Sequence, residues 1–428
     1  MAAAPSSNHS PSFEPWMLSN VITGAVMAGF VTLLIPPFVT SVTGSAARAG
    51  VAFSLISLAA TLGPVFGRLA DRTGAYRVVY TLAFVGMAAG FAVLALDANS
   101  DTYTPIASLL IGASIAAKGT VGSALVVGSG LSRAVQAKQL TVYNLLTFPG
   151  QIVGAGIVAL LHALDTDYAT QFWSVAAFIA AASLVVWWTT EPPQRRIRTA
   201  TSARVAAERD GDSSDVPRLL GSGFVAFMVT TFLVMAAFAA ISSQIANIMP
   251  AVFDLGIVAT SGLVALAGLA GIPAVILAGA WLGRDGSAPP FRMSVVIRVG
   301  GALAMAAAGA AAGGAAIAVL ASAGYVLMMT GNAVQRSVMP RVAVRLLPRA
   351  GEANGYAAAA GASGGFVGCI AAGAIADQWS FELVLWVAAV VAALSLVPLP
   401  RVLRHVRAAR DADETLVHTH AMGSPPQG

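Results

Sequence analysis

The sequence predicts an all-α polytopic membrane protein with twelve transmembrane helices in two pseudo-symmetric six-helix bundles. Of its 428 residues, 57% are hydrophobic and 10% are charged, whereas soluble domains carry about a quarter charged residues. A bilayer core needs roughly 20 apolar residues per helix, and twelve such runs follow one another along the chain. One long hydrophilic segment near the middle separates six runs from six.

Short polar loops separate most of the predicted spans. We expect the spans at residues 17–40, 47–68, 78–97, 104–128, 139–163, 171–190, 219–245, 256–282, 291–313, 315–338, 352–376 and 380–400. The chain then divides into a disordered cytoplasmic tail at 1–16, an N-terminal bundle at 17–190, a cytoplasmic linker at 191–218, a C-terminal bundle at 219–400 and a cytoplasmic basic tail at 401–428.

Charge placement predicts the orientation in the membrane. Of the 24 Lys and Arg residues, we place Arg48 in an outer loop and Lys118 and Arg298 within spans, which leaves the other 21 on one side. The loops of the opposite side are almost purely acidic. Cytoplasmic loops carry an excess of Lys and Arg, so both termini of this multi-pass cell-membrane protein are expected in the cytoplasm. The pI near 9.7 then reflects topology and not nucleic-acid binding.

The two halves share a sequence pattern. Gly150-Gln-Ile-Val-Gly154 in span five corresponds to Gly364-Gly-Phe-Val-Gly368 in span eleven. Each motif is followed by an alanine-rich helix end, an acidic outer loop and a span that contains tryptophan. Duplicated six-span units that enclose a site near the midplane are typical of secondary transporters that work by alternating access.

Residues 67–77 form a short charged loop between spans two and three and read GRLADRTGAYR. Gly67 and Gly74 suit a turn or a close backbone approach, while Asp71 offers an acceptor to a helix N-terminus or an arginine. The segment resembles the cytoplasmic signature G-x-L-a-D-r-x-G-r-k of the major facilitator superfamily. The resemblance covers nearly the whole chain and implies the major facilitator fold.

In that superfamily the signature residues hold the two halves together on the cytoplasmic side. The resemblance therefore implies a cytoplasmic gate whose partners lie at the end of span four and at the start of span eleven, near Glu352. The gate residues that it implies are Gly67, Asp71, Arg72, Gly74, Arg77 and Arg133.

Lys118 lies fourteen residues into the span that begins near Thr104, about 21 Å along the helix at ~1.5 Å per residue. An ammonium at that depth costs roughly 2.5–3.5 kcal/mol, and such residues usually face a cavity. Lys118-Gly-Thr-Val-Gly122 is similar to the fourth-span motif R-x-x-x-G of the superfamily, whose arginine is associated with proton coupling. We expect Lys118 to attract an anionic substrate, to titrate as a coupling group, or to pair with a neighbouring helix.

Neutral polar residues complete the expected cavity. Gln151 and Tyr325 are predicted at mid-depth, and Asn144 and Asn332 nearer the cytoplasm. Each is a candidate substrate contact, and each could instead form a hydrogen bond between helices. The many Ala, Val, Phe and Met side chains suit a mainly apolar or amphipathic small molecule.

Charged side chains are otherwise expected near the membrane surfaces. No Asp or Glu falls near the middle of a predicted span, although proton-driven transporters commonly use a buried carboxylate. Arg298 lies only seven residues beyond Phe291, so we expect its side chain to snorkel to the cytoplasmic surface. The five His residues never lie together within one span, and no nucleophile, base and acid cluster, so neither an enzyme nor a metal site is expected.

The span-five segment Pro149-Gly150-Gln-Ile-Val-Gly154-Ala155-Gly156 is similar to the motif G-x-x-x-G-P of the twelve-span drug/proton antiporter branch, with Ala155 in place of proline. This resemblance implies a monomeric efflux transporter with a small-molecule substrate in the lipid bilayer, no cofactor, and the proton gradient as its energy source. A proton-coupled or facilitative importer of a small metabolite is the alternative, and Lys118 would suit an anionic one. A non-transporting membrane receptor or assembly protein is a third interpretation.

Overall fold

The computed structural model describes residues 13–197 and 221–409, except 128, 130, 132, 285, 312, 313, 348 and 349. Most of the predicted tails and linker, at 1–12, 198–220 and 410–428, lie outside the described residues. The described part contains twelve helices long and apolar enough to cross a membrane, which confirms the predicted number. They are Pro15–Thr43, Ala46–Thr73, Tyr76–Leu96, Thr104–Val127, Lys138–Ala163, Tyr168–Thr189, Ser222–Ser242, Ile257–Leu282, Ala288–Gly309, Ala315–Leu346, Ala353–Gln378 and Phe381–Ala409.

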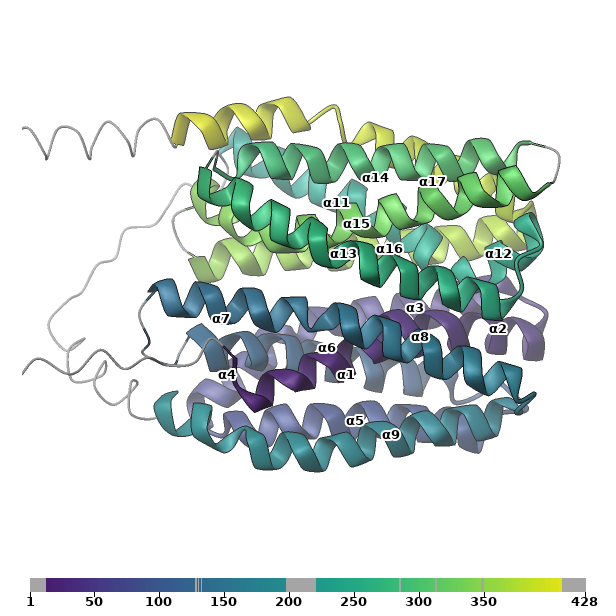
Figure 1. Ribbon diagram of the computed structural model, residues 1–428, viewed down its shortest axis with the longest axis horizontal. Coiled ribbons are helices and arrows are strands. Elements are labelled where there is room, and N and C mark those ends of the chain that lie inside the picture. The colour runs from purple at the N-terminus through teal and green to yellow at the C-terminus, as the bar shows by residue number, and fades with distance from the viewer. Residues whose placement is uncertain are drawn as a thin grey trace, which may run out of the picture.

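Several spans consist of more than one helical element, as Figure 1 labels them. The elements are η1 (Pro15–Leu18), α1 (Ser19–Gly24), η2 (Ala25–Val31), α2 (Thr32–Thr43), α3 (Ala46–Ala59), η3 (Ala60–Leu62), α4 (Gly63–Thr73), α5 (Tyr76–Leu96), α6 (Thr104–Val127), α7 (Arg133–Leu145), α8 (Thr147–Ala163), α9 (Tyr168–Thr189), α11 (Ser222–Ser242), α12 (Ile245–Phe253), α13 (Ile257–Arg284), α14 (Ala288–Gly309), α15 (Ala315–Leu346), α16 (Ala350–Gln378) and α17 (Phe381–Leu394).

The helices form two groups that lie side by side, α1 to α9 in the N-half and α11 to α17 in the C-half (Figure 1). Twelve spans run alternately up and down, so the chain enters and leaves each half at the same end. We call the end with Gly74, Glu191 and Gly221 the linker end. The opposite end, with Gly44 and Asp254, is the loop end.

The glycine motifs of the sequence repeat pack the same way in both halves. In the N-half, a Cβ added to Gly154 of α8 would collide with the backbone of Ala25 in the first span. In the C-half, a Cβ on Gly368 of α16 would collide with the backbone of Ala236 in α11. Lipid offers no hydrophobic drive for helix association, so such backbone contacts supply the van der Waals attraction. Spans five and eleven thus dock onto spans one and seven in equivalent ways.

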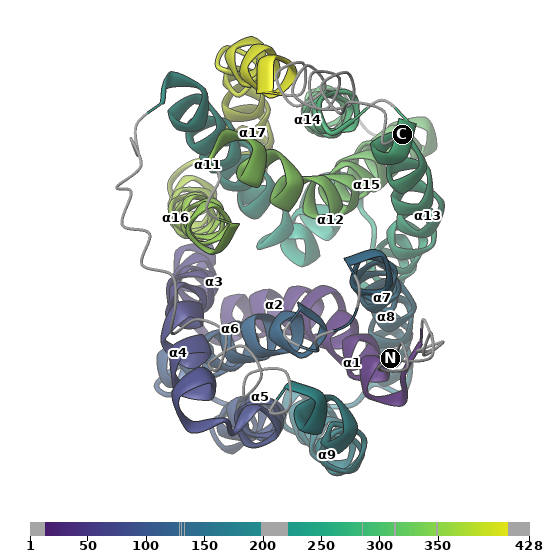
Figure 2. The same cartoon turned by 90° about the vertical axis from the view of Figure 1, so that its left-hand side faces the viewer.

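The two halves meet along two pairs of helices. Helix α3 packs against α16, and α8 packs against α13. Figure 2 views the molecule from the linker end. There the two pairs lie at opposite edges of the boundary between the halves, α3 with α16 on the left and α8 with α13 on the right. The short helix α12 leaves the loop end of span seven and contacts α2 of the N-half. The space between these contacts is where a substrate site between the halves would lie.

Candidate functional site between the two halves

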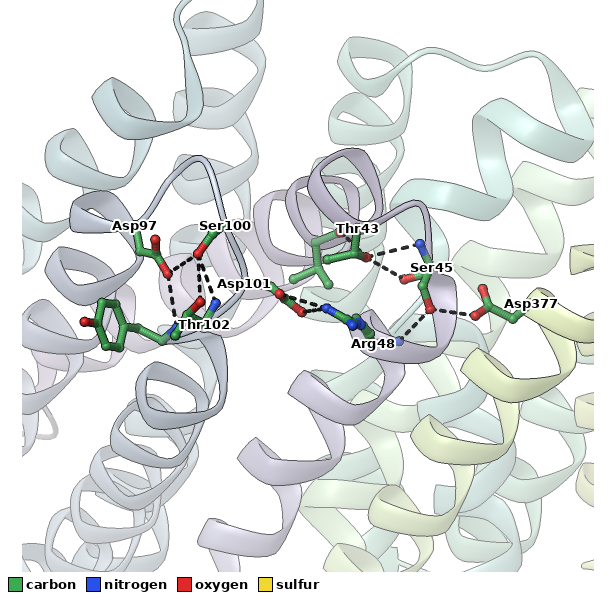
Figure 3. A network of polar contacts seen from close by, with 10 residues as sticks. Thr43, Ser45, Arg48, Asp97, Ser100, Asp101, Thr102 and Asp377 are labelled. Atoms are coloured by element: carbon green, nitrogen blue, oxygen red, sulfur yellow. Dashed lines mark hydrogen bonds and ion pairs between the residues drawn. The ribbon is translucent and has the colours of Figure 1, made fainter.

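At the loop end, hydrogen bonds join the N-half to the C-half. Asp377, at the end of α16, accepts a hydrogen bond from the Ser45 hydroxyl at 2.6 Å (Figure 3). It also accepts one from the Ala46 backbone N–H at 2.6 Å. Close by, Asn247 of α12 donates to Thr40 at 3.0 Å, and Gln244 donates to the Ala46 carbonyl at 3.1 Å. The N-terminus of α3 is therefore held against the C-half at this end.

The same loop segment is also fixed within the N-half. Ser45 is the N-cap of α3 and accepts from the Arg48 backbone N–H at 3.3 Å. The Arg48 guanidinium contacts both carboxylate oxygens of Asp101, the closer at 2.7 Å (Figure 3). The start of α3 therefore contacts both Asp377 of the C-half and a second loop of the N-half.

Gln151 joins the halves at mid-depth. Its Nε2 donates to the Val264 carbonyl of α13 at 2.7 Å, and its side chain is buried. Gly268 of α13 lies against the Gln151 side chain and the Phe148 carbonyl, so the two helices approach closely there. From the sequence, Gln151 was expected either to contact the substrate or to form a hydrogen bond between helices. In the structure it forms a hydrogen bond between helices.

Lys118 of α6 lies buried in the N-half, with 3% of its surface exposed. Its Nζ donates to Asn20 Oδ1, and it lies 4.8 Å from the centroid of the Tyr143 ring, a cation–π distance. Asn20 in turn donates to the Tyr143 carbonyl and to Thr147 Oγ1, the latter at 3.0 Å. Neutral groups hold this cation, so its positive charge is not cancelled by them.

Arg298 of α14 is also buried, with 2% exposed, and the prediction that it snorkels to a surface is wrong. Its guanidinium donates to Gln335 Oε1 of α15 and to the Val234 carbonyl of α11, the latter at 2.8 Å. Phe238 lies beneath it, with the ring centroid 4.9 Å from Cζ. The side chain turns inward because these acceptors lie beside α14 at its own depth, whereas the linker end of α14, at Ala288, is ten residues, or about 15 Å, away.

Arg336 adds a third positive charge that the sequence interpretation did not single out. It follows Gln335 in α15 and is exposed. Its charge acts on both Lys118 and Arg298. Since its charge reaches one cation in each half, Arg336 lies near the boundary between the halves.

These three cations share one depth. Lys118, Arg298 and Arg336 lie nine or ten residues from the linker ends of α6, α14 and α15. At ~1.5 Å per residue this is about 14–15 Å from those ends, close to the middle of a bilayer core. The motif R-x-x-x-G pointed to Lys118 in the sequence. Whether the side chains of Arg298 and Arg336 face lipid or the interior depends on the rotation of their helices, which the sequence alone did not reveal.

The remaining predicted contacts differ in position. Asn332 is buried and lies one helical turn from Arg336, so the structure brings it to the face of α15 that carries the cation. Tyr325 is buried eleven residues nearer the loop end than Arg336. Asn144, by contrast, is exposed near the end of α7.

The signature loop predicted at residues 67–77 is mostly helical: residues 67–73 form the last turns of α4 at the linker end, and Gly74 ends that helix with a left-handed φ of 64°. Asp71 accepts a hydrogen bond from the Tyr76 hydroxyl at 2.6 Å, within its own half. Gly67 permits a close approach to Thr120 of α6. Arg72 is exposed, and the side chains of Arg133 and Glu352 lie outside the described residues.

Arg77 ties the signature loop to the end of span six. Its guanidinium lies 3.8 Å from the Trp187 ring centroid and donates to the Trp187 carbonyl. It also lies 3.7 Å from Glu191, and its backbone N–H donates to Gln194 at 2.7 Å. The start of the linker is thereby attached to the N-half.

Glu14 is a buried carboxylate that the sequence interpretation assigned to the N-terminal tail. It lies 7% exposed just before η1 and accepts hydrogen bonds from Trp16 at 3.1 Å and Gln139 at 2.8 Å. It also forms an ion pair with Arg196, beyond span six. The sequence did contain a signal for its position. Proline favours the first position of a helix, so Pro15 indicates that a helix begins there and that Glu14 directly precedes it.

Comparisons with known proteins agree with this architecture. The family profile of the Major Facilitator Superfamily matches residues 16–368. The chain therefore belongs to the major facilitator superfamily; it is a multi-pass secondary transporter and not an enzyme. No curated protein matches the chain.

Among solved structures, the chain is similar to crystal structures of the nucleoside transporter NupG. A mutant form of NupG superimposes with a TM-score of 0.69 at 13% identity, covering 90% of this chain and 98% of that chain. A second NupG structure gives 0.65 at 14% identity, covering 91% and 97%. At such identity the likeness shows the fold alone.

Proposed function

We propose that the protein moves a small amphipathic organic molecule across the cell membrane by alternating access, with the substrate bound between the halves at the depth of Lys118. The observation that carries the proposal is the pair of buried cations, Lys118 in the N-half and Arg298 in the C-half, at one depth. Intramembrane charges are costly and usually mark substrate or ion pathways. Asn332 lies near the site, whereas Gln151 serves the contact between the halves.

We further propose that the linker end faces the cytoplasm, because the Lys and Arg residues gather in the loops of that end. The described hydrogen bonds between the halves lie at the loop end, at Gln151, and between Ser57 of α3 and Cys369 of α16. This arrangement fits a conformation that is closed toward the outside. The signature loop then acts as the gate of the opposite conformation, when Asp71 exchanges Tyr76 for a partner on the C-half.

Efflux driven by the proton gradient is the proposed direction, and it rests on the likeness of the signature loop and the span-five glycines to the antiporter branch. Import of a small anionic metabolite is the second candidate. The burial of Arg298 favours it, because that arginine adds a positive charge to the site.

Drug susceptibility of cells with and without the protein tests the direction. Efflux predicts higher tolerance of at least one amphipathic compound, and loss of that tolerance in Lys118→Met. The compound is then loaded into proteoliposomes, and its counterflow is measured with a proton gradient imposed in either orientation. Accumulation inside cells that depends on Lys118 would instead establish import.

A further inference from the structure

Cations without carboxylate partners surround the proposed site. In the described part of the chain, the four ion pairs involve Arg48, Arg77, Arg195 and Arg196, all near helix ends. By contrast, Lys118 donates to a side-chain amide oxygen, and Arg298 donates to a side-chain amide oxygen and a backbone carbonyl, all of them neutral acceptors. A buried charge is costly unless it is paired, so the site favours a partner of opposite charge.

Gln335 presents an unused donor beside these cations. Its Oε1 accepts from Arg298, and arginine can only donate, which fixes the orientation of the amide. Its Nε2 is buried and has no hydrogen-bond partner among the described residues. A buried donor that lacks a partner costs free energy, and a ligand with an acceptor atom would satisfy it. Gln335 precedes Arg336, so both positions belong to the same turn of α15.

The charged side chains at this site and the free nitrogen of Gln335 are therefore all donors. Lys118 and the two arginines carry no acceptor, and the amide oxygen of Gln335 is already engaged. A sugar hydroxyl or an ammonium group would present donors that find few acceptors. A carboxylate or phosphate presents acceptors only, in the planar or forked geometry that arginine recognises.

We propose that the transported substrate is an organic anion whose carboxylate or phosphate group binds between Lys118 of the N-half and Arg298, Gln335 and Arg336 of the C-half. The inference rests on the proposed function and names its substrate class. The rest of the substrate is partly apolar, because Met235 and Phe238 lie against the Arg298 guanidinium.

Binding is tested on the full chain in lipid nanodiscs by thermal unfolding. The probes are benzoate, hexanoate and phenylphosphonate, compared with the neutral benzamide and hexanamide, and with sodium chloride at equal ionic strength. We expect at least one anion to raise Tm in a saturable way and its matched amide to leave Tm unchanged. Equal effects of an anion and its amide, or no effect of any anion beyond sodium chloride, would overturn the proposal.

Variants locate the bound anion. Arg336→Gln is the principal variant because its side chain is exposed, and Arg298→Gln is the second because it is buried and could also affect folding. Loss of one charge-assisted contact is expected to weaken the anion Kd by about tenfold or more. The matched controls are Arg341→Gln in α15 and Arg292→Gln in α14, which are exposed and nearer the helix ends. Equal Kd values in Arg336→Gln and Arg341→Gln would contradict the proposal.

Two results would separate the anion site from transport. Transport of neutral compounds only, unaffected by Arg336→Gln, would refute the anion site and leave alternating access intact. Anion binding that depends on Arg336, without any counterflow of the bound anion, would refute transport and leave the anion site intact.

Discussion

The carboxylate of Asp377 caps the helix that begins at Ala46, although the two residues belong to different halves (Figure 3). The backbone N–H groups at a helix N-terminus lack intrahelical partners and carry a partial positive charge. Asp377 supplies an acceptor to one of them and a second contact to Ser45. This cap stabilises closure of the loop end and breaks when the halves separate there.

Asp377→Asn is expected to shift the protein toward the conformation open at the loop end. Asp377 is exposed, so the lost hydrogen bonds are worth about 0.5–1.5 kcal/mol, a shift of roughly twofold to tenfold in population. Cross-linking of cysteine pairs placed across α3 and α16 at the loop end measures it. Glu382→Gln, an exposed acid at the same end, is the control and should leave the cross-linking yield unchanged.

Lys118→Met is expected to abolish transport while expression and membrane insertion stay normal. Methionine has a similar volume but cannot donate to Asn20 or attract an anion. Counterflow in proteoliposomes and size-exclusion profiles measure the two properties. Lys138→Met, at an exposed lysine, serves as the control. Transport that survives in Lys118→Met would assign the lysine a structural role.

Asp71→Asn is expected to slow turnover more than it weakens substrate binding. An exposed charged contact is worth about 1 kcal/mol, so loss of the proposed gate contact slows turnover roughly fivefold. Tyr76→Phe removes the present partner of Asp71 and keeps the carboxylate. If Asp71 acts as a gate, Tyr76→Phe should not slow turnover; equal slowing in both variants would show that only their mutual hydrogen bond matters.

Gln151→Leu tests the contact between the halves at mid-depth. Loss of the hydrogen bond to Val264 should lower the free energy of unfolding by about 0.6 kcal/mol and leave the substrate Kd unchanged. Gln171→Leu is a matched control, because Gln171 donates to the Thr166 carbonyl within one half. A weaker substrate Kd in Gln151→Leu alone would place this amide in the substrate site.

Glu14→Gln is expected to lower Tm. The change leaves Arg196 without its ion pair, and since the arginine side chain is 30% exposed, the cost is about 1–2 kcal/mol. Arg195→Gln is the control, because its ion pair with Glu191 is on the surface and its side chain is 78% exposed. A Tm in Glu14→Gln equal to that of Arg195→Gln would show that Glu14 contributes no more than a surface charge.

The sequence predicted the spans well because apolar length is a local property. The predicted start of span four, residue 104, is the start of α6, and most other boundaries differ by a few residues. The repeated glycines predicted equivalent packing in the two halves, and the structure shows it at Gly154 and Gly368.

The candidate site was predicted less completely because it depends on helix rotation and on contacts between distant segments. Lys118 was identified from its depth in the span and from the motif Lys118-Gly-Thr-Val-Gly122. Arg298 was expected only seven residues from the start of its span, but α14 begins ten residues before it, at Ala288. Its acceptors on α11 and α15 show that the side chain turns inward. Glu14 was missed because its partners, Gln139 and Arg196, are distant in the sequence.

The single cysteine of the chain offers a native reporter. Cys369 is buried in α16, beside Ser57 of α3 and Ser243 at the end of α11, where the two halves touch. The backbones of Gly50 in α3 and Cys369 in α16 also approach closely at this contact between the halves. Because the sulfur is buried, we expect alkylating reagents to reach it only when α3 and α16 separate. The rate at which the unmodified protein reacts therefore measures how often the two halves come apart there, without any engineered label.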